Sequence, residues 1–275
     1  MEKLYEEILS LAADAARKAG IFIREARGNG LLVSAKSRND FVSDKDQMSE
    51  NMIREMILEK YPDHLFFGEE SVSGCSPEEE REQIEAFRDE DFIWAVDPID
   101  GTVNYIRDYP QYAVSVGVIH RREIIAGAVY DPFRDELFTA RKGHGAFRNG
   151  ERIRVSAAKE TGDAIVNTSM PVCSMTTRAD MVSRIPAVSG VFQSMRVWNC
   201  AAVSLASVAC GRSDADYEAG IHLWDMAAGI LLVREAGGEV TRMDGSPCTL
   251  AQTDVLASNG RFHAEAVRAL NGNKE

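Results

Sequence analysis

Four apolar, β-prone segments follow one another between residues 92 and 140, and this run constrains the fold more than any other part of the sequence. Turn residues separate the segments, which read FIWAV at 92–96, AVSVGVI at 113–119, EIIAGAVY at 123–130 and ELFTA at 136–140. The short links are typical of antiparallel hairpins, because parallel neighbours need a long crossover connection. We therefore predict an antiparallel sheet here.

Helical patterns surround this run. Residues 3–26 carry apolar side chains at spacings of three and four, which predicts an amphipathic helix ending near Gly28. A second helix is predicted from about Asp46 to Lys60, with a buried face made of Met48, Met52, Ile53 and Met56. The acidic stretch 76–90 is typical of a solvated helix or loop.

Beyond residue 160 strands alternate with longer apolar helices, notably at 201–211 and 224–238. Two sheet layers covered by helices are the natural packing solution for this pattern. We predict two α+β halves, 1–155 and 156–275, joined near residue 155 into one compact unit.

Composition excludes several classes of protein. The 275 residues are 45% hydrophobic, enough for a large core, and no stretch reaches the roughly 18 apolar residues of a membrane span. The acidic N-terminus does not resemble a signal peptide, so we expect a cytoplasmic protein. The net charge of −12 argues against nucleic acid as a partner. Five scattered cysteines suggest reduced, mostly buried thiols.

The stretch DPIDG at 97–101 follows the first of the four strands. A single turn could bring the carboxylates of Asp97 and Asp100 to one side, where they could hold a cation. Pro98 fixes the bend, and Gly101 lets the backbone approach a ligand closely. If a helix begins here, the amides of Gly101 and Thr102 would bind an anion beside the cation. Taken alone, however, this composition is more often a surface turn.

Acidic residues elsewhere in the sequence favour a metal site over a surface turn. The paired glutamates of GEES at 68–71 repel each other unless a positive group lies nearby. Asp225, in HLWD, begins an apolar helix, where it could be an N-cap or a ligand. Oxygen donors without a cluster of His or Cys favour Mg²⁺, Mn²⁺ or Ca²⁺ over zinc. His222 is closest to these acids, and we expect it to pack beside the site.

Three segments in order, GEES, WAVDPIDGTVNY at 94–105 and GIHLWDMAAGILLVREAGG at 220–238, resemble the signature regions of the inositol monophosphatase family of lithium-sensitive, Mg²⁺-dependent phosphatases. Further segments resemble family members through nearly the whole chain. The resemblance implies a layered αβαβα sandwich of the sugar and inositol phosphatase type, and commonly a homodimer.

The resemblance also implies roles for individual residues. The first metal would be held by Glu69, Asp97 and the carbonyl of Ile99, and the second by Asp97, Asp100 and Asp225. A third, weaker ion would depend on Glu69 through waters. Four further residues match the catalytic set: Asp46 and Thr102, which help to activate water, the neighbouring acid Glu70, and Lys36.

Residues that match substrate contacts form the last group. The amides of Gly101 and Thr102 match a phosphate cradle beside Asp100, and Glu218 and Ala201 match contacts to substrate hydroxyls and ring. Without the resemblance, Glu218 would be read as an exposed strand end. Val103 and Tyr105 depart from the commoner Thr and Phe of the family.

We therefore expect a phosphomonoesterase that acts on inositol monophosphate or a similar small polyol phosphate by direct attack of a metal-activated water. Alternative substrates for the same fold are fructose 1,6-bisphosphate, NADP, histidinol phosphate and phosphoadenosine phosphate. A metal-binding regulatory protein without catalysis is an alternative of another class. A Ca²⁺-binding structural protein is less favoured, because no D-x-D-x-D-G loop is present.

Overall fold

The computed structural model describes residues 1–27, 32–35, 41–171 and 174–272. Its larger sheet has seven strands that lie in chain order. They are β3 (Leu65–Gly68), β4 (Phe92–Asp100), β5 (Ala113–His120), β6 (Glu123–Asp131), β7 (Glu136–Arg141), β8 (Gly145–Arg148) and β9 (Glu151–Arg152). β3 and β4 are parallel, and every later pair in this sheet is antiparallel. The predicted antiparallel run is therefore confirmed, with its first strand extended to Asp100.

The second sheet has five strands in the order β11-β10-β12-β14-β13. Their bounds are β10 (Ile165–Thr168), β11 (Ser194–Val197), β12 (Ala215–Ala219), β13 (Glu239–Thr241) and β14 (Asp254–Ser258). β10 runs parallel to β11 and β12, whereas β14 is antiparallel to both of its neighbours. A small antiparallel ribbon pairs β1 (Val33–Ala35) with β2 (Phe41–Ser43).

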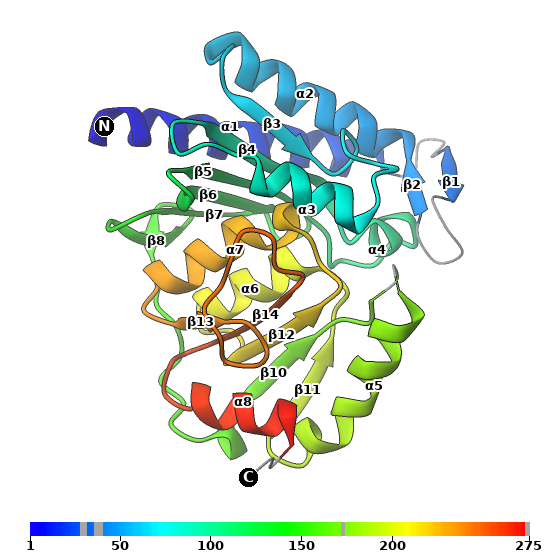
Figure 1. Cartoon of the computed structure of the whole chain (residues 1–275), viewed down its shortest axis with the longest axis vertical. Coiled ribbons are helices and arrows are strands. Elements are labelled where there is room, and N and C mark those ends of the chain that lie inside the picture. Colours follow the sequence, from blue (N-terminus) through cyan, green and yellow to red (C-terminus); the bar gives the residue numbers. More distant parts are fainter. Residues whose placement is uncertain (28–31, 36–40, 172–173, 273–275) are drawn as a thin grey trace.

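Helices separate and cover the sheets in five layers (Figure 1). α1 (Glu2–Ala26) and α2 (Asp44–Lys60) share a core with one face of the larger sheet. α6 (Ala201–Ala209) and α7 (Leu223–Glu235) lie between the two sheets, and α5 (Met175–Ser189) and α8 (His263–Asn271) pack on the outer face of the smaller one. The shorter helices are α3 (Pro77–Glu85), α4 (Thr102–Ile106) and the 3₁₀ turn Thr161–Asp163. The predicted layered α+β sandwich is confirmed.

Two glycines let α7 approach the larger sheet closely. A Cβ atom on Gly117 of β5 would lie 2.6 Å from Cβ of Ala227, and one on Gly127 of β6 would lie 2.9 Å from Cα of Ala228. Interiors pack too densely to absorb such overlaps. The small residues therefore fix the depth at which α7, which carries Asp225, sits against the sheet.

The predicted buried face of α2 is confirmed for Ile53 and wrong for Met48. Met48 is 48% exposed, whereas Asp46 and Glu50 are buried on the same side as Ile53. Hydrophobicity placed the methionines inside, but hydrogen bonds from neighbouring segments satisfy the two carboxylates and allow them to be buried. The prediction of mostly buried cysteines is also wrong for the described residues, since only Cys200 is fully buried.

No helix in the described ranges combines the length and the apolar composition needed to cross a membrane. The cytoplasmic location and the division of the chain near residue 155 stay predictions.

Candidate functional site

The site is built around the end of β4. In a regular strand, residues three apart point to opposite faces, but the register of β4 against β5 shifts between Asp97 and Asp100. The amide of Ile99 donates to Oδ1 of Asp97 over 2.9 Å, which stabilises this irregular turn. The shift brings the two carboxylates to the same cavity.

Asp225 approaches from the middle layer. It is the third residue of α7, and one of its oxygens accepts a 2.6 Å hydrogen bond from the amide of His222, the residue that caps the helix. Asp225 is therefore not the N-cap that the helix pattern allowed. Carboxylate oxygens of Asp97, Asp100 and Asp225 lie within 4.8 Å of one another, a spacing that suits a shared cation.

Glu69 lines the same cavity from the end of β3. Its amide donates to the carbonyl of Val96 over 3.1 Å, which extends the parallel β3–β4 pairing by one residue beyond the strand. Four acids from three separate segments therefore converge, although the chain carries them far apart.

The negative charges of these acids are not balanced by positive groups of the described residues, as the directions of their pKa shifts indicate. Burial raises the pKa of Asp97 well above its ordinary value, and the charges of Glu69, Asp100 and Asp225 raise it further. Burial and the charge of Asp225 raise the pKa of Asp100 to about 7, although the amide of Ala202 opposes the shift. Buried like charges favour protonation or a bound cation. The buried oxygen donors therefore fit a hard divalent ion such as Mg²⁺.

Asp46 and Thr102 meet beside this cluster. Asp46 is fully buried at the start of α2, where Oδ2 accepts hydrogen bonds from the amide and hydroxyl of Ser43. Its Oδ1 lies 3.3 Å from the Thr102 hydroxyl, which lies 2.9 Å from the Ile99 carbonyl. A hydroxyl has one proton to donate, so Thr102 can serve either acceptor.

Gly101 joins β4 to α4 in a conformation that favours glycine. Its φ is +84°, and a Cβ atom there would lie 2.7 Å from the carbonyl oxygen of Gln111. α4 begins at Thr102, so the amides of both residues stand at the turn as the DPIDG pattern predicts.

The described part of the chain places neither Glu70 nor Lys36 at the acidic cavity. Glu70 is not among the residues that line the acidic cavity, and its amide donates to Oε2 of Glu50 over 2.8 Å. Lys36 lies outside the described residues. Sequence reasoning missed Glu50, which is buried on α2 and also accepts from the Ser71 hydroxyl over 2.6 Å. It anchors the turn that carries Glu69.

The cavity has a volume of about 180 Å³, and residues at the ends of β10 and β12 of the smaller sheet form part of its lining. Glu218, at the end of β12, is fully buried and accepts from the Ser169 hydroxyl over 2.7 Å. Ala201, the first residue of α6, lines the same wall. Glu218 is therefore not an exposed strand end, and both residues face the cavity with the acids.

His222 links the acidic segment to the site. Its Nδ1 lies 2.8 Å from Oε2 of Glu80 on α3, and its ring stacks on Trp224 at 4.7 Å. Burial opposes the imidazolium, but the hydrogen bond to Glu80 and the charge of Asp225 raise the pKa of His222 to about 9. The proximity of Asp225 in the sequence pointed to His222, whereas no signal in residues 76–90 singled out Glu80.

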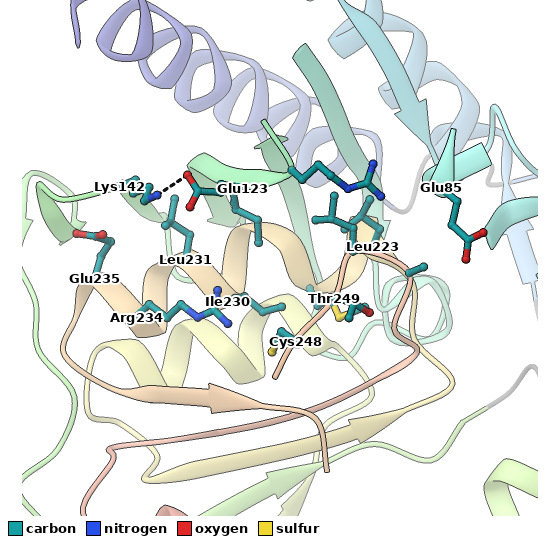
Figure 2. A pocket seen from close by; sticks show the side chains of 15 residues that line it. Glu85, Glu123, Lys142, Leu223, Ile230, Leu231, Arg234, Glu235, Cys248 and Thr249 are labelled. Carbon is teal, nitrogen blue, oxygen red and sulfur yellow. Dashed lines mark hydrogen bonds and ion pairs between the residues drawn. The ribbon is translucent and has the colours of Figure 1, made fainter. Parts of the chain in front are cut away.

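A larger cavity of about 620 Å³ lies along another face of α7 (Figure 2). None of the predicted site residues lines it. Its walls are mainly apolar, and three of its charged groups already have partners: Lys142 pairs with Glu123, and Glu235 accepts from two backbone amides. Size alone would select this cavity. The convergence of acids selects the smaller one.

Comparisons with known proteins identify the relatives of this chain. The family model described as "Inositol monophosphatase family" matches residues 4–275. Inositol monophosphatase 1 of Rattus norvegicus is 36% identical over 96% of this chain and 93% of its own length. Nus factor SuhB of Escherichia coli strain K12 is 36% identical over 92% of each chain. The crystal structure of extragenic suppressor protein suhB from Bartonella henselae superimposes with a TM-score of 0.86 at 34% identity, covering 97% of this chain and 99% of that one.

Proposed function

Because the chain belongs to the inositol monophosphatase family, we propose that it is a Mg²⁺-dependent phosphatase that hydrolyses inositol monophosphate or a similar small polyol phosphate. The family supports a phosphatase acting on a small phosphate ester. The observation that carries the finer proposal is the convergence of Asp97, Asp100 and Asp225 within 4.8 Å.

The acids would hold two ions. Glu69, Asp97 and the Ile99 carbonyl would hold the first, and Asp97, Asp100 and Asp225 the second, with Asp97 shared. Mn²⁺ suits the same donors, and a third ion would need Glu69. When bound, such ions supply positive charge that makes water a stronger acid and offsets charge on phosphate oxygens. Lithium inhibition belongs to the same proposal by family resemblance.

Asp46 and Thr102 would handle the proton of the attacking water. The Thr102 hydroxyl can accept a hydrogen bond from that water while it donates to Asp46, which lies 3.3 Å away. Asp46 is held rigidly by Ser43, so its orientation is set before substrate arrives. Glu70 and Lys36 complete the proposed catalytic group.

The substrate would lie between the two sheets. Amides of Gly101 and Thr102 would receive the phosphate, since both residues line the cavity where α4 begins. Across the cavity, Glu218 can accept hydrogen bonds from substrate hydroxyls, Ala201 would contact the ring, and Asp100 would lie beside the leaving oxygen. No phosphoenzyme is required, because the attack is direct.

A homodimer is part of the proposal. Tyr109, Phe133 and Val197 are 62%, 57% and 52% exposed. The guanidinium of Arg134 lies over the rings of both Phe133 and Trp198, at 5.8 and 5.9 Å. We define this group of five residues as the apolar patch. Exposed apolar groups of this size often mark interfaces.

The decisive experiment measures phosphate release from inositol 1-phosphate, with and without Mg²⁺. The wild type and Asp97→Asn are compared, and kcat/KM is ranked against fructose 1,6-bisphosphate, NADP, histidinol phosphate and phosphoadenosine phosphate. Mg²⁺-dependent turnover that favours the inositol ester and vanishes in the variant supports the proposal. If only another ester is hydrolysed, that ester replaces inositol monophosphate as the proposed substrate. If no ester is hydrolysed, the proposal that the protein is a phosphatase is wrong.

A regulatory protein is the second candidate, since relatives at the same identity are named Nus factor SuhB. The test is a functional assay in cells with Asp97→Asn, at matched protein levels. If that variant sustains the biological role fully, the regulatory function is favoured over catalysis.

A further inference from the structure

Asp216 is a fully buried carboxylate directly beside Glu218 on β12. Alternate residues of a strand face the same side, so both point toward the layer of α6 and α7, whereas Ala215 and Tyr217 pack into the outer core. In the register of the sheet, Asp216 faces Ala257 of β14, which belongs to the same inner core as α6.

The pair lacks hydrogen-bond donors. Among the described residues, no group outside the pair itself donates to either oxygen of Asp216 or to Oε2 of Glu218. Glu218 Oε1 is satisfied by the Ser169 hydroxyl. An unsatisfied buried carboxylate is costly, and a pair of them more so. A proton, a cation or a water molecule is therefore needed to satisfy these oxygens.

The described residues of the neighbouring elements offer Asp216 no counter-charge. β10 places Asn167 beside Asp216, but its amide exchanges hydrogen bonds with Ser213. β14 places Ala257 opposite Asp216 and Val255 opposite Glu218, and the buried hydroxyls of Ser204 and Ser207 on α6 have no partner among the described groups. The charged groups that act on the pair are further carboxylates, Asp100 for both members and Asp225 for Glu218.

Two such groups do not ionise together at neutral pH. Burial raises the pKa of Asp216 to about 8, although a hydrogen bond with Glu218 lowers it. Burial and the charge of Asp216 raise the pKa of Glu218 well above its ordinary range. Adjacent buried carboxyl groups titrate as a unit, and one shared proton both neutralises a charge and forms a strong hydrogen bond.

We propose that Asp216 is a positioning residue that shares one proton with Glu218 and so holds the Glu218 carboxyl group in a single orientation at the cavity. The positioning role of Asp216 rests on the proposed function, in which Glu218 accepts hydrogen bonds from substrate hydroxyls. The shared proton also prevents a second negative charge from developing beneath an anionic substrate.

The pair itself is tested without substrate. Infrared difference spectra compare the Mg²⁺-loaded wild type with Asp216→Asn at pH 7, where bound Mg²⁺ keeps the cluster acids ionised. The expected result is a protonated carboxyl band in the wild type that the variant lacks. A spectrum without that band would overturn the proposal. So would a melting temperature that depends on Na⁺ or K⁺ in the wild type but not in the variant, because a monovalent cation would then replace the proton.

Kinetics test the positioning role. Asp216→Ala should raise KM about tenfold with kcat within about twofold, because Glu218 loses its hydrogen bond. Asp216→Asn should restore most of the affinity, since its carboxamide donates to ionised Glu218 at the same net charge. In the wild type, KM should rise as the pH passes through about 8, the pKa of Asp216. This rise should be absent in Asp216→Asn.

Ser213→Ala is the matched control, because it removes a buried neighbour that bonds to Asn167 and not to Asp216. It should lower stability and leave KM unchanged. Equal KM values for Asp216→Ala and the wild type would overturn the positioning role. If no ester is turned over, the proposed function fails and the infrared result still decides whether the proton is shared.

Discussion

The backbone amide of Ala202 donates a 2.6 Å hydrogen bond to Oδ2 of Asp100. It joins the first turn of α6 to the end of β4, and the Cys200 thiol lies 3.3 Å from the same oxygen. Two elements from different parts of the chain therefore orient one carboxylate of the acidic cluster. The cluster is held by the fold as well as by the local turn.

Mg²⁺ should stabilise the protein. The carboxylates of Asp97, Asp100 and Asp225 repel one another in the folded chain, and a cation that binds only there shifts the folding equilibrium. At a free concentration of about 100 times Kd, we expect about 2.7 kcal/mol, or roughly 5–10 °C in melting temperature. Calorimetry with Mg²⁺ and with a chelator checks this, and Asp97→Asn should lose most of the shift. If Mg²⁺ raises the melting temperatures of the wild type and Asp97→Asn equally, the ion binds at another site.

Without divalent ions, stability should fall as the pH rises from about 4 to 7. The pKa of Asp100 is raised from 3.8 to about 7 in the folded protein, so the unfolded chain releases this proton first. Each such group lowers the free energy of unfolding by up to about 1.4 kcal/mol per pH unit in this window. Urea unfolding with a chelator measures the slope. Saturating Mg²⁺ should remove the contribution of the cluster acids and leave that of Asp216 and Glu218, and an identical slope in both conditions would contradict the assignment.

Gly101→Ala should both destabilise and inactivate the protein. A side chain at φ +84° is strained, and its Cβ would clash with Gln111 and approach Cys200. We expect a loss of about 2–4 kcal/mol and at least tenfold in kcat/KM. Gly74→Ala is the control, because φ there is +96° with open space around it. If both variants lose equal stability and activity, backbone strain alone is responsible.

Glu80→Gln should weaken the junction between α3 and α7. The pKa of His222 is raised from 6.5 to about 9, so this stabilisation is complete below pH 6.5 and disappears as the pH rises through 9. A loss of about 1–2 kcal/mol is expected at pH 6. Thermal unfolding from pH 6 to 10 checks this. Glu78→Gln, exposed on the same helix, should have no comparable effect, and a pH-independent loss at Glu80 would refute the ion pair.

Phe133→Glu should separate a dimer into monomers, because a charge within the apolar patch would have to be desolvated in the interface. Light scattering after gel filtration gives the mass directly. Met48→Glu, which places the same charge at a 48% exposed site on α2, is the control. If Phe133→Glu forms dimers as stable as those of the wild type, the apolar patch is not part of the dimer interface.

The local pattern of apolar and polar residues predicted much of the fold, but it did not predict the contacts between distant segments that complete the site. The strands up to Asp97 and the helix that begins near Asp225 follow from side-chain periodicity, which is a short-range property. The partners of Glu50, Glu80 and Asp216 depend on packing between distant segments. Their burial therefore could not be read from neighbouring residues, and α2 was predicted with its methionines inward for the same reason.

The order of the acidic residues along the chain has a consequence for biosynthesis. Asp97 and Asp100 leave the ribosome long before Asp225, which lies on α7 near the end of the sequence. A nascent chain that stops before α7 therefore lacks both the third carboxylate and the helix layer that encloses the cavity. The acidic cluster therefore cannot guide the early steps of folding, because it is completed only after most of the chain has been synthesised. Binding of a metal ion at the cluster would then indicate that the chain has finished folding.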